Sequence, residues 1–296
     1  MNYKKLGKSE IQVSEVAFGC MSLGHSDSDN KQLLLKAFDN EINFFDTADL
    51  YAEGKNETTI GKAFKEIRSK IILATKVGNQ LRADGSGWDW NPTKKYILEA
   101  VDKSLKRLQT DYIDLYQLHG GTIDDPIGET IEAFEILKQQ GKIRMYGISS
   151  IRPNVIREYV KRSGIDSVMM QYSLLDRRPE ESCFDLLLNN NISVLVRGAL
   201  AQGLLINKPF KTYLNRSMEE VEGASKAIKE TKERTPHEVA LQFALQPAAV
   251  SSVVVGISSI NQLNEILQAV NRSPLTVKEI IHLQENTKPN FYEQHR

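Results

Sequence analysis

Short apolar runs recur along the chain, and helical segments lie between them. Eight of these runs are almost continuously apolar and rich in β-branched and aromatic residues, which is typical of parallel strands covered on both faces. They are EVAFG (15–19), NFFDT (43–47), IILAT (71–75), YIDLYQL (112–118), IRMYGIS (143–149), VMMQY (168–172), ISVLVRG (192–198) and SSVVVG (251–256). The segments between them are amphipathic. In residues 91–108, for example, a proline lies near the start and apolar residues recur every three or four positions, which predicts a helix.

This alternation predicts an α/β fold. Eight strand and helix units in about 250 residues favour a closed (β/α)8 TIM barrel over a doubly wound sheet of about six strands. Residues 3–13 hold two short extended runs around Gly7, so we expect an N-terminal β-hairpin that closes one mouth of the barrel. No linker-like stretch divides the sequence, which predicts a single domain over residues 1–296. Residues 198–216 form the longest segment without periodicity and are expected to be a binding loop.

Composition narrows the possible partners. Lys plus Arg and Asp plus Glu total 38 each, so the formal net charge is zero, and nothing predicts binding to nucleic acid or to a membrane surface. The most apolar stretch, residues 248–257, is far shorter than the roughly 20 residues of a spanning helix. Cys20 and Cys183 are too few for a disulfide framework, and the first residues lack the apolar run of a secretory signal, so we expect a cytoplasmic protein. The histidines are scattered without ligand spacing, which predicts no metal site.

Polar side chains stand where three of the apolar runs end. Asp46, Lys76 and His119 each follow a predicted strand, and Tyr51 lies five residues after Asp46. In a TIM barrel the functional residues gather at the carboxyl ends of the strands, so these four side chains are expected to face one mouth. Each alone has an ordinary structural explanation, such as capping a turn or reaching solvent. Together they make a proton-donating group.

The expected chemistry follows from the residue types. A nearby ammonium favours phenolate, so Lys76 would lower the pKa of Tyr51, and Asp46 would pair with the buried ammonium. His119 would hydrogen-bond the reacting oxygen. Such a group protonates an oxygen on which negative charge develops, which suits reduction of a carbonyl. None of these side chains supplies a hydride, so a cofactor must.

The motifs FGCMSLG, NFFDTADLYAEGKNE, ILATKVG, YIDLYQLHG, GKIRMYGISS, MQYSLLDRR and VLVRGALAQGLL closely resemble the aldo-keto reductase family, with a weaker match at SVVVGISSINQL. The resemblance implies a barrel that binds a nicotinamide cofactor, with Asp46, Tyr51, Lys76 and His119 as its catalytic tetrad. It implies that Ser149 and Gln171 hydrogen-bond the nicotinamide carboxamide and that Tyr172 stacks on the ring. Further cofactor contacts are expected at Gly19, Met21, Arg197, Gly198, Leu200, Gln202, Lys208, Gly256, Ser258, Gln262 and Glu265.

The coenzyme prediction rests on a departure from that family. Many members clamp the 2′-phosphate of NADPH with lysine or arginine after the last strand, but residues 256–270 contain neither and include Glu265. Ser258, Ser259 and Gln262 remain at the expected start of a helix, whose backbone N–H groups bind phosphate, and Lys208 is expected to reach the pyrophosphate. We therefore expect NADPH to be preferred, by a modest margin, with NADH also possible.

Two other functions remain open from the sequence. The family also includes nicotinamide-binding regulatory β subunits of channels, which keep the barrel and most of the site. A barrel lyase or hydrolase that uses Lys76 as a Schiff base would need that lysine without an acidic partner. The partner of the leading function is a small carbonyl compound, and Trp88 and Trp90 are candidates for the wall of its pocket or for a surface loop packed on itself. Neither the substrate nor the oligomeric state follows from the sequence.

Overall fold

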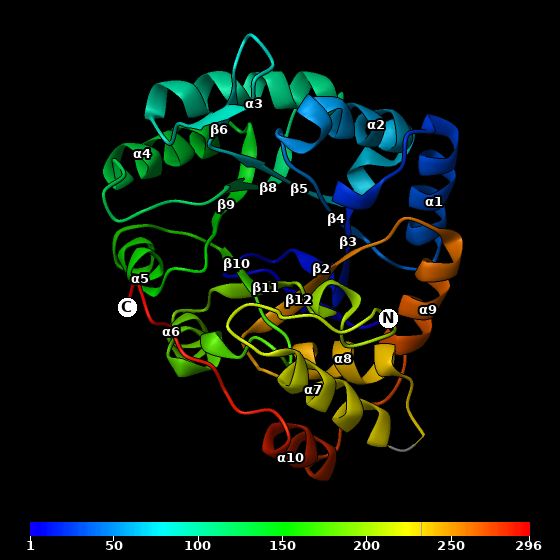
Figure 1. Ribbon diagram of the computed structural model, residues 1–296. Helices are drawn as coiled ribbons and strands as arrows, with labels where there is room; N and C mark the ends of the chain where they lie inside the picture. The colour runs from blue at the N-terminus through cyan, green and yellow to red at the C-terminus, as the bar shows by residue number, and fades with distance from the viewer. Residues whose placement is uncertain (232) are drawn as a thin grey trace.

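The computed structural model describes residues 1–231 and 233–296. Eight parallel strands form a closed barrel, in which the last strand pairs with the first (Figure 1). They are β3 (Val16–Gly19), β4 (Phe44–Asp46), β5 (Ile72–Val77), β8 (Ile113–Leu118), β9 (Ile143–Ser149), β10 (Ser167–Gln171), β11 (Ser193–Arg197) and β12 (Val250–Gly256). Each lies within one of the eight apolar runs, or extends beyond it by one or two residues. The predicted (β/α)8 barrel is confirmed.

Helices surround the barrel and cover the outer face of its strands (Figure 1). The ring consists of α1 (Asp27–Asp39), α2 (Lys55–Phe64), α3 (Lys94–Leu108), α4 (Ile127–Gln139), α5 (Pro153–Arg162), α6 (Cys183–Asn189), α8 (Pro236–Leu245) and α9 (Ile260–Val270). Two further helices, α7 (Met218–Glu230) and α10 (Val277–Glu285), pack against each other outside this ring. The helix predicted in residues 91–108 is α3, which Thr93 caps by accepting a hydrogen bond from the Tyr96 N–H.

The strands are apolar on both faces because each face meets a different core. Side chains that point inward form a small cluster inside the barrel, which includes Phe44, Leu115 and Met169. Side chains that point outward join the larger core between strands and helices. Alternate residues of a strand therefore belong to separate cores, and the sequence reads as a continuous apolar run.

A hairpin of β1 (Tyr3–Lys5) and β2 (Gln12–Ser14) closes the amino-terminal mouth, as predicted. Leu6 and Val13 are buried in the inner cluster. Gly7 lies at φ +58°, and a Cβ atom there would come 2.4 Å from the carbonyl oxygen of Asp166, so the turn requires glycine. The hairpin leaves the opposite mouth, at the carboxyl ends of the strands, for function.

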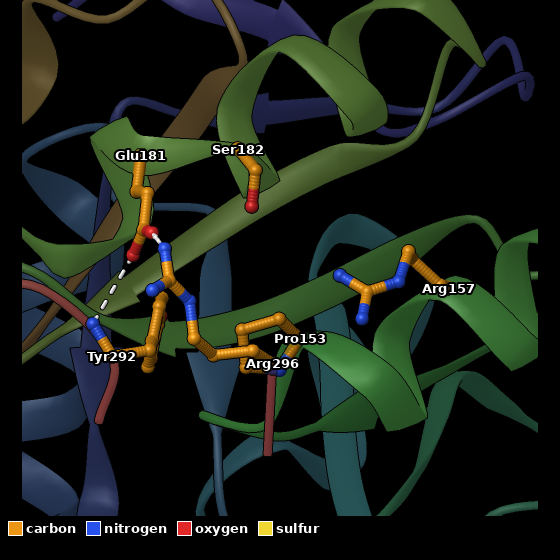
Figure 2. Close-up of a pocket in the computed structure, with 6 residues that line it drawn as sticks. All are labelled: Pro153, Arg157, Glu181, Ser182, Tyr292 and Arg296. Atoms are coloured by element: carbon orange, nitrogen blue, oxygen red, sulfur yellow. Dashed lines mark hydrogen bonds and ion pairs between the residues drawn. The ribbon is translucent and has the colours of Figure 1, made fainter. Parts of the chain in front are cut away.

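The carboxyl-terminal segment runs from α10 past α6 to α5 (Figure 1). The Asn154 N–H donates to the carbonyl of His295 at 2.9 Å. A cavity of about 220 Å³ lies where this segment meets α5 and the start of α6 (Figure 2). Beside it, the Tyr292 N–H donates to Glu181, and Arg296 forms an ion pair with the same Glu181 side chain. The same carboxylate thus ties two residues of the chain end to the barrel.

Candidate active site

A cavity of about 1200 Å³ opens at the carboxyl ends of the strands. All four residues of the predicted tetrad line it, so the structure brings them together as expected. The cavity also contains most of the residues predicted for the cofactor site: Gly19, Met21, Ser149, Gln171, Arg197, Gly198, Leu200, Gln202, Lys208, Gly256, Ser258, Gln262 and Glu265. It extends from the tetrad to the start of α9.

A buried ion pair joins Lys76 and Asp46 at the base of the cavity. The Lys76 Nζ atom donates to Asp46 Oδ2 at 2.6 Å and to the Thr47 carbonyl at 2.7 Å, and the two side chains are only 1% and 5% exposed. Burial alone would depress the pKa of Lys76, but the Asp46 carboxylate offsets this, and the pKa of the ammonium lies above its usual value. A lysine paired in this way is not set up to form a Schiff base.

Tyr51 comes from the turn that follows β4, and its hydroxyl lies 3.4 Å from Lys76 Nζ. Burial raises the pKa of Tyr51 above its usual value, and the neighbouring Lys76 only partly opposes this. Lys76 lowers the pKa of Tyr51 as predicted, but desolvation of the phenolate outweighs the attraction of the ammonium, so the net pKa lies above its usual value. The phenol stays protonated around neutral pH and is ready to donate.

His119 follows β8 and faces Tyr51, with the ring centroids 5.8 Å apart and the planes at 80°. Burial, followed by the charges of Lys76 and Arg197, lowers the pKa of His119 to about 3. The imidazole is therefore neutral at physiological pH. Its Nδ1 atom is buried and has no hydrogen-bond partner in the described chain.

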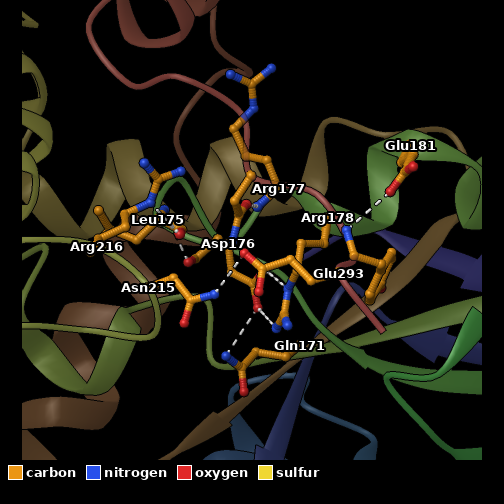
Figure 3. Close-up of polar contacts among 12 residues, drawn as sticks. Gln171, Leu175, Asp176, Arg177, Arg178, Glu181, Asn215, Arg216 and Glu293 are labelled. Carbon is orange, nitrogen blue, oxygen red and sulfur yellow. Dashed lines mark hydrogen bonds and ion pairs between the residues drawn. The ribbon is translucent and has the colours of Figure 1, made fainter. Parts of the chain in front are cut away.

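Gln171 ends β10 inside a polar network (Figure 3). Its Oε1 atom accepts from Arg197 Nη1 at 2.9 Å, and its Nε2 atom donates to Asp176 Oδ2 at 3.0 Å. Asp176 is fully buried and forms two hydrogen bonds of 2.7 Å with Arg178. Arg216 donates to the Leu175 carbonyl at 2.8 Å, so the end of the long loop at residues 198–216 is fixed to the same network. The amide of Gln171 is thereby oriented before any ligand binds.

Tyr172 does not line the cavity. Its ring is 1% exposed and packs on Phe184 and Phe243, and its hydroxyl donates to Glu180 at 2.8 Å. The prediction that Tyr172 stacks on a nicotinamide is wrong, because successive residues of a strand point to opposite faces and Gln171 takes the inward position. Tyr213, from the long loop, lines the cavity instead and lies 3.3 Å from Gln171 Nε2. No periodicity in that loop could have identified it.

Trp88 and Trp90 belong to a hairpin of β6 (Asn79–Leu81) and β7 (Trp88–Trp90), and neither lines the cavity. Trp88 is 47% exposed. The Trp90 ring covers Gly78, and its Nε1 atom donates to Asp125 at 3.0 Å. Of the two alternatives left open for these tryptophans, the structure favours a loop packed on itself over the wall of the substrate pocket, since the hairpin folds Trp90 onto Gly78. Arg152, which sequence reasoning missed, lines the cavity near Gly121.

The far end of the cavity is formed by the start of α9. The Ser258 N–H and hydroxyl both donate to Gln262 Oε1, at 2.9 and 3.0 Å, and the Ser259 hydroxyl accepts from the Gln262 N–H at 3.2 Å. Ser258 and Gln262 line the cavity, and both are exposed. His237, another residue not foreseen, lies 3.6 Å from Glu265 here. The polar groups predicted to bind a phosphate, on Ser258, Ser259 and Gln262, are therefore already hydrogen-bonded in part to one another.

Within residues 1–231 and 233–296, no group of three or more histidine, cysteine, aspartate or glutamate residues is arranged to hold a metal ion. None of the helices in the same ranges has the length and apolar character needed to span a bilayer.

A model described as the Aldo/keto reductase family matches residues 15–287. The uncharacterized oxidoreductase YqkF of Bacillus subtilis is 53% identical over 306 residues, and the match covers all of both chains. The holo form of aldo-keto reductase AKR11C1 from Bacillus halodurans is similar with a TM-score of 0.95 and 54% identity, covering 100% of this chain and 99% of that one. The NADH-specific methylglyoxal reductase of Escherichia coli is 29% identical over 90% of this chain and 92% of its own.

Proposed function

This chain belongs to the aldo/keto reductase family and is an NAD(P)H-dependent oxidoreductase that acts on carbonyls, and we propose that it uses NADPH to reduce an aldehyde or ketone to the alcohol, with Tyr51 as the proton donor. One observation carries the proposal. The Tyr51 hydroxyl lies beside a preformed Lys76–Asp46 ion pair and opposite a neutral His119, in a cavity of about 1200 Å³ that also reaches the start of α9.

The side chains of the tetrad divide the work. A bound reduced nicotinamide supplies the hydride. Tyr51 donates its proton to the carbonyl oxygen as negative charge develops there, and its raised pKa keeps the donor form populated until that moment. Lys76 stabilises the phenolate that is left, and Asp46 keeps Lys76 charged. His119, being neutral, donates a ring N–H to the carbonyl oxygen and orients it without competing as an acid.

Side chains along the cavity fit a nicotinamide dinucleotide. Ser149 and the oriented amide of Gln171 lie near the tetrad, where a carboxamide would bind. Arg197, which is bonded to Gln171 near the tetrad, and Lys208, from the loop after β11, bring two cations to the same cavity, and Lys208 would pair with a pyrophosphate. Ser258 and Gln262 lie at the far end and offer a hydroxyl and an amide to a 2′-phosphate.

NADPH is proposed over NADH by a modest margin. The E. coli relative is named as NADH-specific, so family membership alone does not fix the coenzyme. A phosphate at the start of α9 would have to displace Gln262 Oε1 from the Ser258 N–H, which reduces the gain. No arginine fork is available within α9, since Ile260–Val270 contains no basic residue.

The test is steady-state turnover of the purified protein with a panel of aldehydes and ketones, followed by loss of absorbance of the reduced nicotinamide. We expect many turnovers per protein with at least one small carbonyl, and a kcat/KM with NADPH a few times that with NADH. Tight binding of NADPH without turnover of any carbonyl would support the regulatory-subunit alternative instead. A higher kcat/KM with NADH would contradict the coenzyme assignment.

A further inference from the structure

Arg152 is a cation of the large cavity that the proposed mechanism does not use. It follows β9, is partly buried, and lines the cavity together with His119 and Gly121. Its Nη1 atom donates to the carbonyl of Gly121. Gly121 lies two residues after His119, so the Cα atoms of these two residues are at most about 7 Å apart. The guanidinium group is therefore anchored on the same short segment as the imidazole of the tetrad.

The backbone on both sides of this contact is held by hydrogen bonds. The Arg152 N–H donates to the Ser150 hydroxyl at 3.1 Å. In the loop after β8, the Thr122 N–H donates to Asp125 Oδ2 at 2.6 Å, and the Thr122 hydroxyl donates to Asp125 Oδ1 at 3.1 Å. Thr122 directly follows Gly121. The side chain of Arg152 thus joins two loops that are already tied down, which gives its guanidinium group a defined position.

No acidic side chain neutralises Arg152. Within residues 1–231 and 233–296, no carboxylate oxygen lies within 4 Å of its side-chain nitrogens, whereas Arg144 on β9 pairs with Asp114 at 2.9 Å. Asp125 instead accepts from Trp90 Nε1 at 3.0 Å. A guanidinium group has five N–H donors, and the bond to the Gly121 carbonyl uses one of them. The others have no partner in the described chain and are available to bind a carboxylate or a phosphate.

Arg152 lies on the side of the cavity away from the proposed phosphate end of the coenzyme. In the barrel order, β8 is four strands from β12 in either direction, and β9 is three strands from β12. The start of α9, with Ser258 and Gln262, follows β12, and Lys208 follows β11. The nicotinamide ring, which would lie near Ser149, carries no anionic group. An anion bound by Arg152 therefore belongs to the substrate.

We propose that Arg152 is a specificity-determining residue that binds an anionic group of the substrate, so that the preferred substrates are small aldehydes or ketones that carry a carboxylate or a phosphate. The proposal rests on the proposed function in taking His119 and Tyr51 as the groups around the carbonyl oxygen. Because Gly121 is at most about 7 Å from His119, a spacer of about two or three atoms between carbonyl and anion fits best.

The test compares substrates that differ only in charge. The first pair is 4-oxobutanoate and its methyl ester, assayed at pH 7 with saturating NADPH. We expect kcat/KM of wild type to be about tenfold higher for the acid, since a charge-assisted pair of hydrogen bonds is lost in the ester. A second pair, glycolaldehyde phosphate and glycolaldehyde, shows whether phosphate is preferred to carboxylate. A ratio near one for both pairs would overturn the proposal.

Variants assign the preference to one side chain. Arg152→Gln keeps an N–H donor and removes the charge, so the acid-to-ester ratio should fall to about one, mainly through a higher KM for the acid. Arg152→Lys keeps the charge without the fork and should retain part of the ratio. The matched control is Arg157→Gln on α5, because Arg157 lines the small cavity near the chain end and not the large one. Its ratio should equal that of wild type.

These ratios do not depend on how much of a preparation is folded, because both substrates are assayed with the same protein. Equal losses in Arg152→Gln and Arg157→Gln would show that only general charge matters, and an unchanged ratio in Arg152→Gln would remove Arg152 from its proposed role.

Binding of succinate, which cannot be reduced, provides a readout without turnover. Calorimetric titration uses protein saturated with NADP⁺, so that the phosphate sites of the coenzyme are already filled. The Kd for succinate should rise by about tenfold in Arg152→Gln and stay the same in Arg157→Gln. If succinate binds in this way but no carbonyl is reduced, only the proposed function fails. If carbonyls are reduced but the Kd is the same in Arg152→Gln and wild type, only this proposal fails.

Discussion

The two ends of the large cavity hold their polar groups in different ways. At the tetrad, Lys76 and Asp46 are almost wholly buried and paired at 2.6 Å. At the start of α9, Ser258 and Gln262 are exposed and bonded to each other. Charges fixed in a buried site need little reorganisation during reaction, whereas exposed side chains can rearrange around a ligand. We infer that the tetrad end determines the chemistry and that the α9 end adjusts the choice of coenzyme.

Removing the proton donor tests the tetrad end most severely. Tyr51→Phe keeps the ring and deletes one hydroxyl, so kcat should fall by roughly 10² to 10⁴. Binding of NADPH, measured by fluorescence titration, should be nearly unchanged. A variant that kept most of its turnover would remove Tyr51 from its proposed role.

Breaking the ion pair should cost both activity and stability. Lys76→Met leaves Asp46 buried without a partner, which destabilises a folded protein by about 3–5 kcal/mol. We expect kcat to fall by on the order of 10² and not to recover between pH 6 and 9, because burial still keeps the pKa of Tyr51 high. Asp46→Asn should be milder if its amide still orients the ammonium. Stability is measured by denaturant unfolding, and wild-type values for Lys76→Met would refute the coupling.

The neutral imidazole makes a prediction about acid. The pKa of His119 is lowered to about 3, so the folded protein binds fewer protons than the unfolded chain between that value and about 6.5. The neutral state of His119 therefore costs the folded protein nothing above pH 6.5. As pH falls below that value, the free energy of unfolding decreases, by on the order of 4 kcal/mol at pH 3. Unfolding of His119→Asn by denaturant should be less sensitive to acid than that of wild type. Parallel curves for the two proteins would show that His119 is not buried as described.

Changing the α9 end should give the smallest effect. Gln262→Arg should raise the ratio of kcat/KM for NADPH over NADH by about five- to tenfold, because a guanidinium can bind a 2′-phosphate through two hydrogen bonds. The kcat value itself should hardly change. Asn264→Arg adds the same charge to an exposed position of α9 that does not line the cavity, and it serves as the control. Equal shifts in the two variants would show that only general charge matters.

The sequence was informative where strand geometry decides the outcome. The eight barrel strands, the N-terminal hairpin and the convergence of the four tetrad residues followed from apolar runs and from the polar residues at their ends. Tyr172 was misplaced although its alternation with Gln171 was available. Tyr213 and the Trp88–Trp90 hairpin depend on loop conformations that no periodicity encodes. The lowering of the Tyr51 pKa by Lys76 followed from the residue types, but the larger opposing effect of burial did not, because burial cannot be measured from a sequence. Domain organisation, cytoplasmic location and individual cofactor contacts remain predictions.

The central claim is direct reduction of a carbonyl at the tetrad by a hydride from the bound coenzyme. The most direct measurement uses NADPH that carries deuterium at both C4 positions, with the wild-type protein and an aldehyde that it reduces, followed by mass spectrometry of the alcohol. We predict one deuterium on the carbinol carbon of each product molecule. An alcohol with only protium at that carbon, or coenzyme that is oxidised without forming alcohol, would contradict the account.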